Sequence, residues 1–450
     1  MFSKSLPKFR GSHSSSLVAK AAIACLPVGM AGAALAALLS AASAIYASDS
    51  HLVISGTSIV EANDPSVHVQ LQGVNLGGWL VPEMSMVPFN STNIPDAYTL
   101  WNTLQSRFGQ TGMENIRTAW RSNWITQNDF SLMHQEGFNL VRIPFEASMF
   151  TNPNEDGFKW LDQAVNWASQ NNMYAVLDMH GAPGGQSSSE DTGQQNQNQF
   201  FSSQTDINQA AQVWSEIAQH YAGNPTIAGY DLLNEPVGAP NYSVLDSVYN
   251  QLYTAIRNTG DQHIIFMEPA HYWDINNLPS PAAMNWYNVA YSGHIYDFSS
   301  RSQTQELLNF SNAITSIAAS AKQQNVPAYI GEFGLIHSNG NSGEFKQVVA
   351  ELNKNNMAWS AWPWKEFSNN PNLRAWGVWQ NPLGMAKMNP LTDSYSQILS
   401  DMSMYQTSNF TFNPAYSPVP EPASLTVMAL ALMALCLGYG KRRKRDEESW

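Results

Sequence analysis

The sequence predicts an α/β fold, a (β/α)8 TIM barrel, on three observations. Short apolar runs recur between residues 51 and 415 and alternate with amphipathic stretches, the pattern of parallel strands covered by helices. Eight such runs fit a closed barrel with insertions better than an open sheet. No glycine-rich phosphate-binding loop is present to favour a doubly wound sheet. A single domain over residues 51–407 is therefore expected.

The elements follow in order along this domain. A short hairpin over residues 51–64 is expected at the barrel floor. Apolar residues at helical spacing mark helices within 160–168 and 245–256. A Gly-, Ser- and Gln-rich stretch at 184–199 follows the third strand, and it is either a loop of the active-site face or a disordered segment. The strands are expected at 67–74, 140–143, 174–177, 227–233, 263–267, 289–292, 328–330 and 358–362.

Charge and composition narrow the class of ligand. Residues 51–415 carry 13 basic and 30 acidic side chains, which would repel a phosphate backbone and exclude nucleic acid as a partner. Polyanionic polysaccharides are disfavoured for the same reason, unless a local basic patch overrides the average. The chain has 15 tryptophans, whose faces stack on flat ligands. A neutral ligand is expected.

Both cysteines, Cys25 and Cys436, lie in the terminal apolar segments. The domain between them can therefore form no internal disulfide. Thiolate catalysis and cysteine-based zinc sites are also excluded there.

The N-terminal segment, residues 1–47, is expected to be an export signal. Scattered basic residues precede an alanine-rich stretch at 21–45, and Ala42, Ala44 and Ala47 offer small-x-small cleavage sites. The alternative is an uncleaved membrane anchor, against which the weakly apolar alanines argue.

The C-terminal segment, residues 419–450, resembles the PEP-CTERM sorting signal of Gram-negative bacteria. Val419-Pro420-Glu421-Pro422 precedes an uncharged stretch at 423–440, and five basic residues follow. The resemblance implies a transmembrane helix with a cytoplasmic basic end and an exosortase-type processing enzyme. A plain single-span anchor is the alternative, and a glycosylphosphatidylinositol signal fits less well because it normally ends in its apolar tail. The domain, joined by a linker at 408–418, is expected at the cell surface, in the outer envelope or outside the cell.

Two glutamates directly after predicted strands are candidates for chemistry on an acetal. Asn234-Glu235-Pro236 follows the strand at 227–233, and Gly331-Glu332-Phe333 follows the strand at 328–330. Cleaving a glycosidic bond requires an acid to protonate the leaving oxygen and a carboxylate on the opposite side of the sugar. Active sites of these barrels lie at the strands' C-terminal ends, so both glutamates are expected at one site. Each motif alone is weak, because a strand-end turn or a capping residue would look the same.

Together and in this order, the two motifs resemble glycoside hydrolase family 5, a family of retaining β-glycanases on (β/α)8 barrels. The resemblance extends from about Leu71 to Lys365. It implies that Glu235 is the acid/base and Glu332 the nucleophile, with no metal or other cofactor. Neighbouring cations are expected to keep Glu332 ionised while Glu235 stays protonated.

The same resemblance implies roles for residues at the ends of other strands. An arginine lies near the nucleophile, a histidine contacts the sugar, and a His-x-Tyr pair flanks the nucleophile. A lone arginine is otherwise more often an ion-pair residue, and a lone histidine a core group. Asp178 is expected to have a structural role, and Glu268 is expected to have a structural role or to bind the sugar. The residues implied to bind the substrate are Glu83, Arg142, His180, Asn234, His294, Tyr296 and Trp362.

Trp362 matches the aromatic platform under the sugar at the cleavage point. The flat apolar face of a sugar stacks on such a ring, whose rigidity costs little entropy. Trp359 and Trp364, beside it in the sequence, are expected in the core.

Two further segments resemble the branch of the family that contains exo-β-1,3-glucanases. They are Gly73–Glu83 and His180–Gln186, and Glu83 matches a carboxylate that binds the terminal sugar in that branch. The linkage and the exo or endo mode stay open.

The sequence is thus interpreted as an exported retaining hydrolase of a neutral β-glucan, with β-1,3 or β-1,4 linkages. A non-catalytic carbohydrate-binding barrel of an extracellular matrix is one alternative. A transglycosylase, in which a sugar hydroxyl replaces water, is another.

Overall fold

The computed structural model describes residues 51–300, 302–336, 342–369, 376–413 and 416. These residues belong to one compact unit, Ala44–Pro418. The expected export signal and sorting segment, with its predicted span, lie outside the described residues. Within the described part of the chain, no helix is both long enough and apolar enough to cross a membrane.

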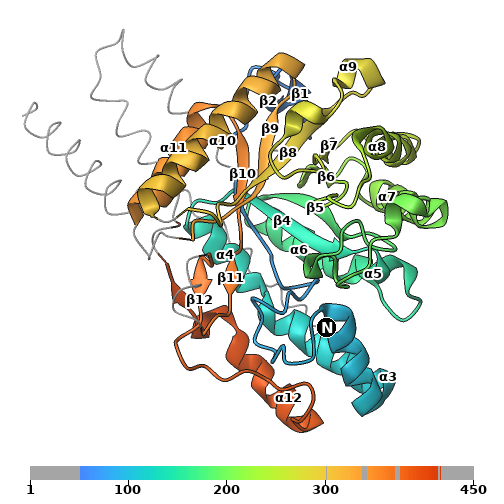
Figure 1. Ribbon diagram of the computed structural model, residues 1–450, viewed down its shortest axis with the longest axis vertical. Coiled ribbons are helices and arrows are strands. Elements are labelled where there is room, and N and C mark those ends of the chain that lie inside the picture. Colours follow the sequence, from blue (N-terminus) through green and yellow to red (C-terminus); the bar gives the residue numbers. More distant parts are fainter. Residues whose placement is uncertain (1–50, 301, 337–341, 370–375, 414–415, 417–450) are drawn as a thin grey trace, which may run out of the picture. The chain divides into compact units, whose positions relative to one another are not determined.

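Eight parallel strands close into a barrel, with helices around it (Figure 1), which confirms the predicted (β/α)8 fold. Each strand pairs with its neighbours in sequence order, and the last strand pairs back with the first. The strands are β3 (Gln72–Asn75), β4 (Leu140–Glu146), β5 (Tyr174–Gly181), β6 (Ile227–Asp231), β7 (Ile264–Met267), β8 (Val289–Ile295), β9 (Ala328–Phe333) and β10 (Ala358–Ala361).

Helices α3 to α11 lie between these strands in the sequence and cover the outside of the barrel, and α12 follows the last strand. In α6 and α8 the predicted apolar stripes are buried, and both helices begin at a capping side chain: Asp156 accepts from the amide of Lys159, and Asn241 from that of Val244. The helices are α3 (Ala97–Trp124), α4 (Gln127–Gln135), α5 (Ser148–Thr151), α6 (Gly157–Gln170), α7 (Gln204–Tyr221), α8 (Tyr242–Arg257), α9 (Pro281–Met284), α10 (Gln303–Gln324), α11 (Ser342–Lys354) and α12 (Tyr395–Asp401). Short 3₁₀ turns are η1 (Glu190–Thr192), η2 (Phe200–Ser202), η3 (Ile275–Asn277), η4 (Met402–Tyr405) and η5 (Thr407–Asn409).

The expected hairpin closes the end of the barrel where the strands begin. β1 (Leu52–Ser55) and β2 (Ser58–Glu61) pair antiparallel. Leu52 and Ile59 are buried in one apolar cluster with residues near the strands' N-terminal ends, such as Leu140 and Tyr174. Apolar side chains therefore fill this end, and the opposite end carries the polar groups.

The first barrel strand begins at Gln72, five residues later than the predicted start at residue 67. Residues 67–71 lie against the hairpin: the Val69 amide donates to the Ile59 carbonyl, and His68 bridges to Val60. These residues share the apolar character of a strand because they pack at the barrel floor.

The expected linker is also partly wrong, because the described chain stays folded through Asn413. β13 (Thr411–Phe412) pairs with β12 (Trp379–Gln380), which also pairs with β11 (Lys365–Glu366). Lys365 is buried, and its ammonium donates to the backbone carbonyls of Trp124 and Tyr405. Lys365 therefore links the segment around Tyr405 to the end of α3.

Candidate active site

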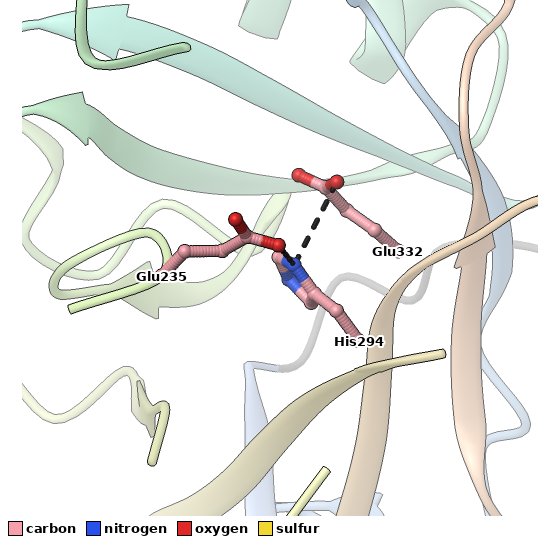
Figure 2. Close-up of side chains that lie close together, drawn as sticks. All are labelled: Glu235, His294 and Glu332. Carbon is pink, nitrogen blue, oxygen red and sulfur yellow. Dashed lines mark hydrogen bonds and ion pairs between the residues drawn. The ribbon is translucent and has the colours of Figure 1, made fainter. Parts of the chain in front are cut away.

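Glu235 and Glu332 meet at the C-terminal end of the barrel. Glu332 lies in β9, and Glu235 follows β6. One oxygen of each carboxyl group and one ring nitrogen of His294 all lie within 4.8 Å of one another. Figure 2 shows the three side chains converging from separate segments of the chain. The structure thus places two carboxyl groups within the span of one sugar ring.

Two donors hold the carboxylate of Glu332. Nη1 of Arg142 donates to Oε1 at 2.8 Å, and the hydroxyl of Tyr296 donates to Oε2 at 2.9 Å. Glu332 is 5% exposed, and Arg142 is fully buried. Because both of its oxygens accept a hydrogen bond, the carboxylate is held in one orientation.

Arg142 is the charged centre of the site. Its guanidinium also contacts Asp231 at 3.0 Å, Asp178 at 3.1 Å and Glu268 at 3.2 Å. Burial alone would lower the pKa of Arg142, but these carboxylates outweigh it and the pKa is raised well above its ordinary value. Burial raises the pKa of Asp231 to about 7, and the neighbouring Glu268 adds to the effect. Four acids around one arginine are a network whose members depend on one another.

His294 joins the two glutamates to this network. Its Nδ1 lies 2.9 Å from Oε1 of Glu235 and 3.6 Å from Oε2 of Glu332, and its Nε2 lies 3.1 Å from Glu268. Burial acts to lower the pKa of His294, but the charges of Glu268 and Glu332 dominate and raise it well above its ordinary value. The imidazolium form is therefore favoured in the free site.

This arrangement corrects the expectation that Glu235 stays protonated. Burial does act to raise the pKa of Glu235, but the hydrogen bond from His294 and the charges of His294 and His180 outweigh it. The pKa of Glu235 is lowered and that of His294 is raised, so this conformation favours a carboxylate beside an imidazolium. The sequence motif around Glu235 gave no sign of this contact, because His294 is 59 residues away.

Local sequence explains how each glutamate is presented. Glu235 has a left-handed backbone with φ of 39°, and its amide donates to Oε2 of Glu268 at 2.8 Å, which stabilises this strained turn. Before Glu332, a Cβ atom at Gly331 would lie 2.8 Å from Oγ of Ser292 and 2.9 Å from Nε2 of His294. Glycine is therefore needed there for His294 to pack against β9.

His180 and Trp362 form one wall of the site. Their rings are parallel within 2°, with centroids 5.5 Å apart. Nδ1 of His180 contacts Asp178 at 2.7 Å, and its Nε2 lies 4.0 Å from Glu83. Burial acts to lower the pKa of His180, yet Asp178 raises it to about 9. Burial raises the pKa of Glu83 well above its ordinary value.

The loop at 184–199 lies beside His180 and Asn234, and Gln186 holds it there. The Gln186 amide nitrogen donates to the carbonyls of His180 and Asn234, and its oxygen accepts from the amide of Ala182. Asp191 of the same loop accepts from Asn234 at 3.3 Å, and burial raises its pKa to about 6. The alternative of a disordered loop is therefore wrong.

The spacing of Glu235, His294 and Glu332 is also one that a cation could use. An imidazolium has no lone pair for a metal, and the raised pKa of His294 favours that form. The three groups therefore fit a proton-sharing set better than a set of metal ligands.

All residues that the sequence analysis selected lie in this one site. Arg142 is the third residue of β4, where a strand-end position was expected, because the strand continues to Glu146. The sequence analysis gave no role to Asn75 or Asp231, which contact Arg142, or to Asp191. Asn75 and Asp231 are the last residues of β3 and β6, but spacing alone does not distinguish them from turn residues. Asp191 lies in η1, where the sequence gives no strand-end signal.

Comparison with known proteins follows this geometry. The family model "Cellulase (glycosyl hydrolase family 5)" matches residues 102–368. A β-xylosidase of Phanerodontia chrysosporium is 27% identical over 348 residues, which are 70% of this chain and 71% of that protein. A glucan 1,3-beta-glucosidase of Candida oleophila is 31% identical over 254 residues, which are 50% of this chain and 58% of that protein. The chain thus spans little more than half of the second relative.

Solved structures show the same fold at low identity. AoRut has a TM-score of 0.57 at 18% identity, with 66% of this chain and 89% of that chain covered. An endogalactoceramidase has a TM-score of 0.53 at 19% identity, with 70% and 75% covered. Because the family model matches more than half of the sequence, the chain belongs to glycosyl hydrolase family 5 and is a glycoside hydrolase.

Proposed function

We propose that this protein hydrolyses β-glucosidic bonds of a neutral β-glucan by double displacement with retention of configuration. The separation of Glu235 and Glu332 carries the proposal. Their nearest oxygens lie within 4.8 Å, which suits direct attack and leaves little room for the water of an inverting enzyme.

In the first step Glu332 attacks the anomeric carbon, and the bond to the leaving oxygen breaks as Glu235 protonates that oxygen. The proton comes from Nδ1 of His294 along the existing 2.9 Å hydrogen bond to Glu235. Bound sugar would exclude water and so favour the neutral carboxyl of Glu235 beside a neutral imidazole. Arg142 and Tyr296 orient the attacking carboxylate.

In the second step water attacks the glycosyl-enzyme at the same carbon. Glu235, now ionised, accepts a proton from that water, and the bond to Glu332 breaks. The proton on Glu235 can return to His294, which restores the free site. Glu83, His180, Asn234 and Trp362 would hold the sugar.

Two observations support the substrate class. Residues 51–415 carry 30 acidic and 13 basic side chains, which fits a neutral polymer better than an anionic one. Several relatives carry the name glucan 1,3-beta-glucosidase. The proposed substrates are β-1,3- and β-1,4-glucan. We also propose that the protein is exported and that an exosortase-type enzyme sorts it through residues 419–450.

The anomer released first from each glucan tests the mechanism. The β-anomer is expected from a β-glucan, and an α-anomer would rule out double displacement. Glu332→Gln is expected to lower kcat by about 1000-fold or more while binding persists. An unchanged kcat would remove Glu332 as the nucleophile.

The same assay separates the two alternatives. A carbohydrate-binding barrel would bind glucan and release no sugar. A transglycosylase would yield products longer than the substrate, because a sugar hydroxyl intercepts the same intermediate.

A further inference from the structure

Exposed aromatic side chains gather on the two loops that follow β7 and β8, beside the candidate active site. Tyr272 and Trp273 are 48% and 44% exposed, and their rings stack with centroids 6.3 Å apart. Phe298 is 68% exposed and lies 5.7 Å from Tyr296. Each such side chain forgoes part of the about 1.5–3 kcal/mol that full burial contributes. A group of them rimmed by polar residues is typical of a binding surface.

A cavity of about 380 Å³ lies between Trp273 and α10. Its volume is within the range of pockets that bind small molecules. Tyr296 and Ser299, at and after the end of β8, line one part of it. Asn309, Asn312 and Ser316 line it from α10, where a spacing of three and four residues places them on one helix face.

The chemistry of this lining suits an uncharged ligand with many hydroxyl groups. Among the described residues that line the cavity, none is lysine or arginine. The carboxylate of Asp297 is already engaged, because it accepts from Ser299, Ser300 and Asn309. The hydroxyl of Ser299 and the amide of Asn309 are used in these same contacts. The indole face of Trp273, the amide of Asn312 and the hydroxyl of Ser316 remain, which is a combination that binds the apolar face and the hydroxyl rim of a sugar.

Tyr296 connects the cavity with the candidate active site. Tyr296 is one of the residues that line the cavity, and its hydroxyl donates to Glu332 at 2.9 Å. The main chain of Trp273 also abuts β8, because a Cβ atom at Gly293 would lie 3.3 Å from Cα of Trp273. The cavity and the candidate active site therefore share Tyr296 as a common boundary.

We infer that this cavity is a second sugar-binding site, which takes one unit of the neutral polysaccharide against Trp273 outside the catalytic centre. The inference rests on the proposed function for the identity of the polymer. A site of this kind raises the affinity for long chains and leaves the bond-breaking step unchanged.

Binding and turnover of short and long substrates test this inference. In the full chain carrying Glu332→Gln, Trp273→Ala is expected to weaken binding of β-1,3- or β-1,4-linked glucose hexasaccharides by about 3- to 10-fold, the worth of one aromatic contact. Ser316→Gln, which fills the cavity from α10, is expected to weaken it similarly. In the otherwise native chain, kcat/KM for an aryl β-glucoside is expected to be unchanged by either substitution.

Tyr287→Ala is the matched control, since Tyr287 is 50% exposed and does not line the cavity. Hexasaccharide binding that is equal in the Trp273, Ser316 and Tyr287 variants would overturn the inference, as would no binding by the parent. Trp273-dependent binding without release of sugar would support the cavity and refute the proposed hydrolysis. Hydrolysis of glucan together with hexasaccharide binding that does not depend on Trp273 would support the proposed function and refute the second sugar-binding site.

Discussion

Arg142 is the residue on which the charge balance of the site depends. It is fully buried and contacts Asp178, Asp231, Glu268 and Glu332, so removing it would leave four acids without their shared cation. Because uncompensated buried charge is costly, Arg142→Met is expected to lower the free energy of unfolding by about 3–5 kcal/mol. Urea denaturation measures the change.

Lys354→Met, at an exposed position of α11, is the matched control and is expected to change stability little. If the two variants unfold at the same urea concentration, Arg142 does not stabilise the acids around it.

Tyr296 is expected to act on the reaction through Glu332. Tyr296→Phe keeps the ring and removes the hydrogen bond to Oε2 of Glu332. A hydrogen bond to a charged group contributes about 1.5–3 kcal/mol, so kcat is expected to fall by about 10- to 100-fold with little change in stability. Steady-state kinetics on an aryl β-glucoside measure it.

Tyr242→Phe is the control for this substitution, because the Tyr242 hydroxyl contacts Asn277 on the outside of the barrel. Equal kcat in the two variants would show that the contact with Glu332 has no role in turnover.

The sequence predicted single residues well where a motif placed a polar group beside an apolar run. Glu235 and Glu332 were found in this way and His294 through the family resemblance, and the three side chains do meet. The protonation of Glu235 could not be predicted, because it depends on which nitrogen of His294 faces it and on the distance to Glu268. These are properties of barrel closure that no local pattern encodes.

At the scale of elements, the hairpin β1–β2 closes the barrel floor. Leu52 is fully buried there, far along the strands from the site. Leu52→Ala is expected to lower the free energy of unfolding by about 2–5 kcal/mol, through lost burial and a cavity, without changing KM. Thermal or urea denaturation with parallel kinetics checks both parts.

Leu308→Ala on α10 is the control, since Leu308 is 53% exposed and its truncation costs little. A raised KM in the Leu52 variant would mean that the hairpin also shapes the site.

All eight strands could be located from apolar runs, but their ends could not. β5, β8 and β9 continue beyond the predicted limits because Asp178, His294 and Glu332 interrupt the apolar run while the backbone pairing continues. Polar residues inside a barrel strand are stabilised by one another, and a reading based on hydropathy ends the strand at the first of them.

For the whole molecule, buried acids make stability depend on pH. The pKa is raised by burial to about 7 in Glu146 and Asp231 and to about 6 in Asp191. A raised pKa means that the folded state binds more protons than the unfolded state between the two values. The contribution of these three acids to the free energy of unfolding is therefore fully present below the pKa values of the unfolded chain, at about pH 4 to 4.5. It is lost as the pH rises through 6 to 7.

The melting temperature is accordingly expected to fall between pH 4.5 and 7.5. Glu146→Gln removes one of these acids and is expected to flatten the slope, whereas a substitution of the partly buried Glu114 on α3, which accepts a hydrogen bond from Gln110, is not. A melting temperature that rises over this range would contradict the assignment of raised pKa values.

The network around Arg142 has a consequence for assembly of the molecule. Its partners come from early and late parts of the chain, and Asn75 of β3 bonds both Arg142 and the carbonyl of Gly331 in β9. The arrangement of Arg142 and Glu332 therefore cannot form in a partly folded chain in which the first and last strands are not yet paired. During refolding from denaturant, enzymatic activity should return only when the first and last strands of the barrel pair. Activity is therefore expected to recover later than the helical signal in circular dichroism.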